Sequence, residues 1–195
     1  MIILHLDNRP YFPDLVGQRI KQLSWAGRRE DVAFLARFSP EKARAVILGE
    51  DQMMKRLRPG GHPDAVILDL MVGVEDFNEI GNWIRLVRTL EGTLLASPPD
   101  QWMHLPPDQI ESHIGDDVIA RLAQAYPSVA VGRLARKYGC KVVILSNFDE
   151  RFLPKGDLDR ATQEKLVMAA CGASAYVEKT DNDWQAKLTK ALEDC

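Results

Sequence analysis

The chain has 195 residues, of which 46% are hydrophobic and 27% are charged, and its formal net charge at pH 7 is −3. This composition predicts a globular fold with a sizeable core, and the charge gives no reason to expect a nucleic acid or an anionic membrane as partner. No hydrophobic run approaches the roughly 20 residues that a membrane-spanning helix needs. Cys140, Cys171 and Cys195 form no CxxC pair, which argues against a disulfide framework or a zinc site and predicts a reduced, cytoplasmic setting.

Five short segments rich in apolar and β-branched residues predict strands. They are residues 2–6, 32–38, 65–70, 141–145 and 174–177. The third and fourth segments are apolar almost without interruption, which is typical of parallel strands covered by helices on both faces.

Amphipathic segments lie between these strands. One begins at Ser39-Pro40, a good capping residue followed by a favoured first helical position, and runs to about Leu57. The apolar stripes with helical spacing are Ala43, Val46, Ile47, Met54 and Leu57; Phe77, Ile80, Ile84 and Val87; Val131, Leu134, Ala135 and Tyr138; and Trp184, Leu188, Ala191 and Leu192. Strands that alternate with helices predict an α/β fold with one doubly wound parallel sheet and right-handed crossovers.

The connection between the third and fourth strands is too long for one crossover helix. Residues 91–126 contain two Pro-Pro steps and then a helix-like stretch with Ile110, Ile114, Val118 and Leu122 on one face. We expect this insertion to pack beside the core of a single domain that spans residues 1–195. Its other apolar residues fit either core packing or a partner or dimer contact, and they are Leu94, Leu95, Trp102, Met103 and Leu105.

Polar residues follow four of the five predicted strands. They are Asp7 and Asn8, Asp69, Ser146 and Asn147, and Lys179. Ligands of open α/β sheets bind beyond the carboxyl ends of the strands, so we expect these side chains to converge there. Two carboxylates suit Mg²⁺, and a carboxylate oxygen can attack a phosphoryl group when nearby cations offset its charge. Taken singly, each residue also has an ordinary explanation in turn formation or helix capping.

The sequences around these residues resemble the response-regulator receiver family. The matching stretches are LHLDNRP around Asp7, AVILDLM around Asp69, VVILSN around Ser146 and GASAYVEKT around Lys179. The resemblance implies a five-stranded flavodoxin-like sheet with strand order 2-1-3-4-5 and a helical insertion between strands three and four. It also implies roles for individual residues: Asp69 as phosphoacceptor; Asp7, Asp69 and the Met71 backbone carbonyl as Mg²⁺ ligands; Ser146, Lys179 and Tyr176 as phosphoryl-contacting and switch residues; and Asn8 and Asn147 in secondary positions.

The chain departs from the family pattern in ways that leave two alternatives open. Asn8 stands where receivers carry a second acid, and the Asp7–Asp69 and Asp69–Ser146 spacings exceed the family norm. One alternative is a pseudo-receiver, a binding module that is never phosphorylated. The other is a haloacid-dehalogenase-like phosphatase, whose second motif resembles SNFDERFL after the fourth strand, although Met71 stands where those enzymes have an acid.

The resemblance predicts a stand-alone signalling domain that accepts a phosphoryl group rather than a turnover enzyme. Only one predicted helix follows Lys179, so we expect no attached output domain and signalling through protein contacts. The expected partners are a histidine kinase or phosphotransfer protein and an output protein, with a homodimer as a further form.

Overall fold

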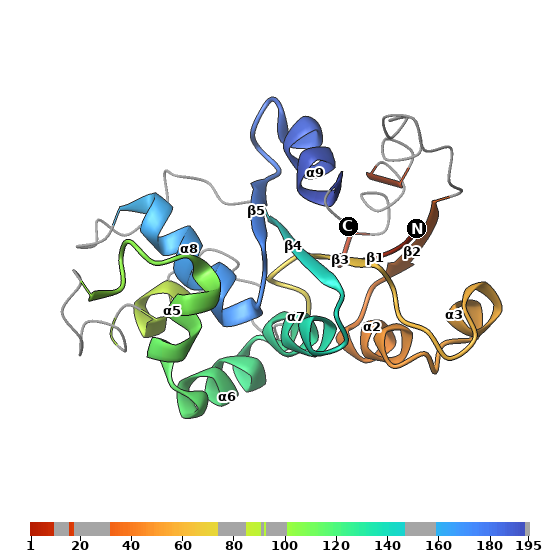
Figure 1. Ribbon diagram of the computed structural model, residues 1–195, viewed down its shortest axis with the longest axis horizontal. Coiled ribbons are helices and arrows are strands. Elements are labelled where there is room, and N and C mark those ends of the chain that lie inside the picture. The colour runs from red at the N-terminus through yellow and green to blue at the C-terminus, as the bar shows by residue number, and fades with distance from the viewer. Residues whose placement is uncertain are drawn as a thin grey trace.

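The computed structural model describes residues 1–9, 16–17, 32–73, 85–90, 92, 101–146 and 159–193. Its centre is a five-stranded sheet in which all neighbouring strands are parallel and the order is β2-β1-β3-β4-β5 (Figure 1). The strands are β1 (Ile2–Leu6), β2 (Ala33–Arg37), β3 (Ala65–Leu68), β4 (Lys141–Ser146) and β5 (Ala175–Glu178). The predicted fold class and strand order are therefore confirmed.

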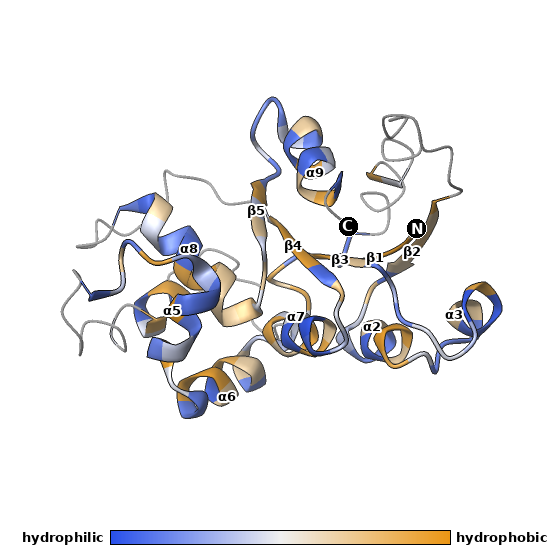
Figure 2. Ribbon diagram, viewed as in Figure 1, coloured by the Kyte–Doolittle hydropathy of each residue, from blue (hydrophilic) through white to orange (hydrophobic). Residues whose placement is uncertain are grey.

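Helices cover both faces of the sheet. On one side lie α2 (Pro40–Ile47), α7 (Pro127–Lys137) and α8 (Arg160–Cys171), and on the other lies α9 (Trp184–Glu193) (Figure 1). Alternate residues of the strands point to opposite faces of the sheet, so the buried residues form two hydrophobic clusters. Leu4 and Leu68 belong to the larger cluster, whereas Ile3 and Ile67 belong to the smaller one. Strand β3 is hydrophobic along its whole length, and β1 is hydrophobic apart from His5, because both faces of these strands are buried (Figure 2).

The segment expected as one helix from Ser39 to Leu57 is two helices. The chain leaves α2 through Gly49, whose φ of +72° lies in the left-handed region, and α3 (Gln52–Leu57) starts after Asp51. The Asp51 carboxylate accepts hydrogen bonds from the backbone N–H groups of Met53 and Met54, which caps the new helix. The change of axis turns Leu57 outward, to 43% exposure, so its predicted place on the buried face is wrong.

Tyr138 is a second correction. The sequence placed Tyr138 on one buried helix face with Val131, Leu134 and Ala135, but α7 ends at Lys137. Tyr138 follows the helix and is 39% exposed, whereas Val131 and Ala135 are buried as expected. Its ring packs against His62, with 4.4 Å between ring centroids.

The insertion between β3 and β4 contains α5 (Pro107–Ile114) and α6 (Asp116–Ala125), separated by Gly115 at a φ of +78°. All four residues of its predicted apolar stripe are buried. Helix α5 packs against α8 and α6 packs against α7. The extent of the insertion from about residue 91 stays a prediction, because residues 93–100, including Leu94 and Leu95, lie outside the described residues.

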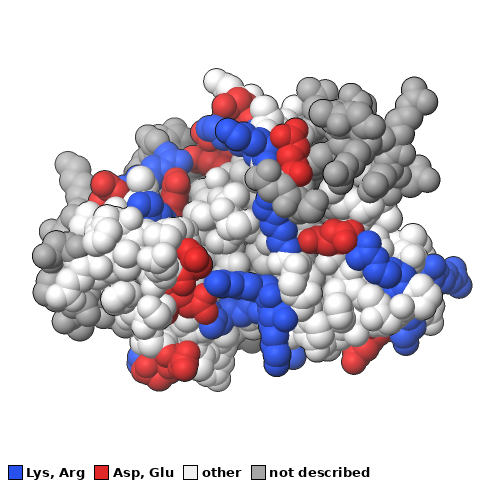
Figure 3. Space-filling view, in the orientation of Figure 1, with Lys and Arg blue, Asp and Glu red and all other residues white. Residues whose placement is uncertain are grey.

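Polar contacts reinforce the packing of the insertion. Glu111 of α5 forms ion pairs with Arg133, at 2.9 Å, and with Arg136 of α7. On the face shown in Figure 3, basic and acidic side chains lie beside one another rather than in separate areas. None of the described helices is long and apolar enough to cross a membrane.

Candidate functional site

The carboxyl ends of the adjacent strands β1 and β3 bring Asp7 and Asp69 side by side. The parallel ladder continues one residue beyond each strand: the Asp7 N–H donates to the Arg37 carbonyl at 3.2 Å, and the Asp69 N–H donates to the Leu6 carbonyl at 2.8 Å. At the β5 end, the Lys179 N–H donates to the Ser146 carbonyl at 2.9 Å. Asp7, Asp69, Ser146 and Lys179 therefore lie at the same edge of the sheet.

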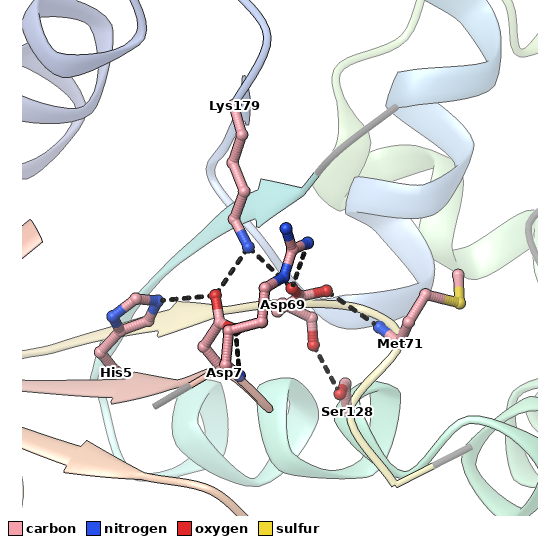
Figure 4. A network of polar contacts seen from close by, with 7 residues as sticks. His5, Asp7, Asp69, Met71, Ser128 and Lys179 are labelled. Atoms are coloured by element: carbon pink, nitrogen blue, oxygen red, sulfur yellow. Dashed lines mark hydrogen bonds and ion pairs between the residues drawn. The ribbon is translucent and has the colours of Figure 1, made fainter. Parts of the chain in front are cut away.

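Lys179 joins the two carboxylates. Its Nζ lies 2.6 Å from Asp7 Oδ2 and 2.7 Å from Asp69 Oδ2 (Figure 4). The Lys179 side chain is 1% exposed and the two aspartate side chains are 0% and 5% exposed. Charge-assisted hydrogen bonds of this length in a buried site are strong and fix the three side chains together.

The other oxygen of each carboxylate accepts a backbone N–H. Asp7 Oδ1 accepts from Arg9 N at 2.9 Å, and Asp69 Oδ1 accepts from Met71 N at 3.1 Å. In each turn an Asp carboxylate accepts a hydrogen bond from the N–H of the residue two positions later, as is common for Asp. The turns and the shared cluster coexist, because each carboxylate uses Oδ1 in its turn and Oδ2 to contact Lys179.

Three residues at this site were missed from the sequence: His5, Arg9 and Ser128. The Arg9 guanidinium lies 3.9 Å from Asp69 Oδ2, with 30% of its side chain exposed. The Ser128 hydroxyl, at the start of α7, donates to the Asp69 carbonyl at 2.8 Å and lies 3.3 Å from the Val72 carbonyl. Ser128 thereby ties α7 to the turn after β3, and nothing in its sequence surroundings indicates that contact.

His5 lies beside Asp7 on β1, with 3.8 Å between His5 Nε2 and Asp7 Oδ2. Residues i and i+2 of a strand face the same side, so the sequence spacing could have predicted this neighbour. Burial, assisted by the nearby Lys179 charge and opposed by Asp69, lowers the pKa of His5 from 6.5 to about 3. His5 is therefore neutral at physiological pH.

This lowered pKa predicts how stability depends on pH in the metal-free protein. Unfolded His5 binds a proton near pH 6.5 but folded His5 does so only near pH 3, so the unfolded state holds more protons between these values. The contribution of His5 to the free energy of unfolding is therefore complete above pH 6.5. It falls between pH 6.5 and 3, by up to about 1.4 kcal/mol per pH unit. Urea unfolding between pH about 5 and 7, above the ordinary carboxylate range, should show this slope. His5→Gln should flatten it, and an unchanged slope in that variant would contradict the assignment.

Ser146 and Tyr176 lie on the neighbouring strands β4 and β5. Ser146 is buried, and Tyr176 is paired in register with Ile144. Burial raises the pKa of Tyr176 well above its ordinary value, and the nearby Glu164 and Glu178 charges raise it further.

Glu178 anchors the chain next to Lys179. It is buried, forms an ion pair with Arg160 at the start of α8, and accepts a hydrogen bond from the Thr180 hydroxyl. Arg160 also pairs with Glu164 at 2.8 Å. These contacts fix the backbone that presents Lys179 to the carboxylates.

The sequence also predicted Asn8 and Asn147 in secondary positions. Asn8 is exposed. Asn147 lies outside the described residues.

The family resemblance implies a Mg²⁺ ion at these residues, and the donors present decide whether it fits. The donors are the Asp7 and Asp69 carboxylates with the Met71 carbonyl, but the exposed Asn8 supplies no third carboxylate. All four carboxylate oxygens already accept hydrogen bonds, and two of them share the Lys179 ammonium. In the described part of the chain, no three His, Cys, Asp or Glu side chains form a group that could hold a metal ion. As arranged, these residues do not fit a divalent cation.

The fold is a flavodoxin-like α/β domain, with Asp7 and Asp69 directly after the adjacent strands β1 and β3 and Lys179 directly after the edge strand β5. Over 99% of its length the chain is similar to the phosphorylated cyanobacterial phytochrome response regulator RcpA, at 13% identity, a TM-score of 0.41 and 89% coverage of that chain. It is also similar to the Mn²⁺-bound form of response regulator Rcp1, at 13% identity, a TM-score of 0.38 and the same two coverages. No family model and no curated protein matches the sequence.

Proposed function

We propose that this chain is a receiver-like signalling domain that accepts a phosphoryl group on Asp69. The supporting observation is the Lys179 ammonium, 2.7 Å from Asp69 Oδ2 at the carboxyl edge of a parallel sheet. A fixed cation at this place can offset the negative charge of an incoming phosphoryl group.

The reaction is a displacement at phosphorus. An Asp69 carboxylate oxygen forms a bond to the phosphorus of a donor such as acetyl phosphate while the bond from phosphorus to the acetate oxygen breaks. The product is an aspartyl phosphate, and acetate leaves with the bonding electron pair. Asp69 is 5% exposed, so the side chain of Arg9 or Lys179 has to move as the donor enters.

The change in charge at Asp69 would reach the rest of the domain through Lys179. An added phosphoryl group competes with the Asp7 and Asp69 carboxylates for the ammonium. Glu178, next in the chain, is bonded to Arg160 of α8, so a movement of Lys179 is transmitted to that helix. The proposed partners are a histidine kinase or phosphotransfer protein as donor and an output protein that contacts the altered surface; a homodimer is a further form.

Intact-mass measurement after incubation with acetyl phosphate tests this function. We expect the wild type to gain the mass of one phosphoryl group, with and without Mg²⁺, and Asp69→Asn to gain none. Lys179→Ala should slow the gain by about 10–100-fold, because the charge that stabilises the transferring group is removed. Asp7→Asn is the matched control, because it removes a neighbouring carboxylate but keeps Asp69 as acceptor, and this variant should still gain mass. A full gain of mass in Asp69→Asn would show that another residue is modified.

The pseudo-receiver is the second candidate, and one observation favours it. The Asp69 and Asp7 oxygens are all engaged by Lys179 or by backbone N–H groups, which makes the cluster complete without a phosphoryl group. Under this alternative no mass is gained with any small donor. The phosphatase alternative has no such support, because Met71 stands where its second acid is needed and contributes a backbone N–H to Asp69.

A further inference from the structure

We infer that the Asp7–Asp69 pair takes its counter-charge from Lys179 and Arg9 and does not bind a divalent cation. This inference contradicts the Mg²⁺ site that the family resemblance implies. It concerns the resting protein and holds whether or not Asp69 accepts a phosphoryl group.

The first observation is the balance of charge. Two carboxylates meet two cationic side chains: Lys179 contacts both acids, and Arg9 lies 3.9 Å from Asp69 Oδ2. The cluster is formally neutral, so it lacks the excess negative charge that attracts Mg²⁺ to a protein.

The second observation is the place of the ammonium. Lys179 Nζ lies within 2.7 Å of one oxygen from each carboxylate, the position that a cation shared by Asp7 and Asp69 would take. The side chain is 1% exposed, so the ammonium cannot turn into solvent without moving the protein around it. Lysine and metal therefore exclude each other at this point.

The third observation is the anchoring of the lysine. The Lys179 N–H is bonded to the Ser146 carbonyl, and Glu178 before it is held by Arg160 and Thr180. Mg²⁺ would have to overcome these contacts as well as its own reluctance to lose water. The site is consequently closed to the metal by Lys179 and the contacts that anchor it, and not only because Asn8 replaces a second acid.

Removing the ammonium should create the metal site that the wild type lacks. We expect titration calorimetry to show no saturable binding of millimolar MgCl₂ or MnCl₂ to the wild type, and its melting temperature to stay unchanged. Lys179→Met leaves two buried carboxylates facing each other, and the same salts should raise its melting temperature by about 5 °C. The added variant Asp7→Asn/Lys179→Met should lose that rise, which locates the new site at this pair.

Lys187→Met is the matched control, because Lys187 is an exposed lysine of the same C-terminal region that pairs with Asp181 and Asp183. It should respond to the salts as the wild type does. Saturable binding to the wild type that Asp7→Asn abolishes would overturn the inference.

Should Lys179→Met fail to fold, Arg9→Gln replaces it, since the Arg9 side chain is partly exposed. Arg9→Gln removes one of the two counter-charges and should bind the salts more tightly than the wild type, whereas saturable binding to the wild type itself overturns the inference. Acetyl phosphate labelling in EDTA separates the two proposals. Equal labelling with EDTA and Mg²⁺ supports both, whereas no labelling removes the proposed function and leaves the titration result standing.

Discussion

Replacing Lys179 with methionine is expected to lower the free energy of unfolding by about 3–5 kcal/mol. The variant keeps the size of the side chain but leaves Asp7 and Asp69 buried without the ammonium that they share. Two close, desolvated carboxylates without a counter-ion are costly, and removing one partner of a buried ion pair has effects of this size. Urea unfolding at neutral pH in EDTA measures the loss.

The control and a second substitution show whether the loss comes from the carboxylates. Lys187→Met, on the exposed surface of α9, should leave the unfolding midpoint nearly unchanged. Adding Asp7→Asn to Lys179→Met removes one of the two opposed charges and should recover part of the stability. A Lys179→Met variant as stable as the wild type, or a double variant with strictly additive losses, would contradict the described cluster.

Replacing Trp102 with alanine should lower the free energy of unfolding by about 3–5 kcal/mol. Trp102 lies in the insertion and is completely buried in the larger hydrophobic cluster. Residues of α7 and α8 belong to the same cluster. Its removal would leave a cavity between the insertion and the sheet domain. Trp184→Ala on α9 is the matched control, because Trp184 is only partly buried, and its loss should be smaller.

The Trp102 result also decides between the two interpretations of the insertion. Burial of Trp102 and the packing of Met103 and Leu105 against the core favour a structural role for these residues. Deleting residues 91–126 should then destabilise the domain rather than only remove a partner. A Trp102→Ala change below about 1 kcal/mol would instead favour the partner or dimer contact.

The strands and the edge of the sheet could be predicted because each depends on short-range patterns. Uninterrupted apolar segments identified β3 and β4 to within two residues at each end, since both faces of those strands are buried. Polar residues directly after the strands placed Asp7, Asp69 and Lys179 at one edge, as the topology requires. The strand order itself came from the family resemblance.

The remaining features depend on side-chain reach and on tertiary contacts. The break between α2 and α3 depends on the backbone conformation of Gly49 and on the Asp51 cap. The spacing of apolar residues carries no information about either, so it predicted one continuous helix. Arg9 approaches Asp69 through space and Ser128 reaches it from α7, fifty-nine positions away in the chain, so neither has a local signal. That Lys179 would fill the place of a metal could be known only from the distances at the site.

We propose Asp69 as the residue that receives the phosphoryl group. Fragment mass spectrometry of the wild type after brief acetyl phosphate treatment, performed under mildly acidic conditions, identifies the modified residue. We predict a single modified position within the peptide that spans Asp69, with Asp7 and the cysteines unmodified. A phosphoryl group at any other residue, or no modification of a folded wild-type protein by this donor, would show that Asp69 is not the acceptor.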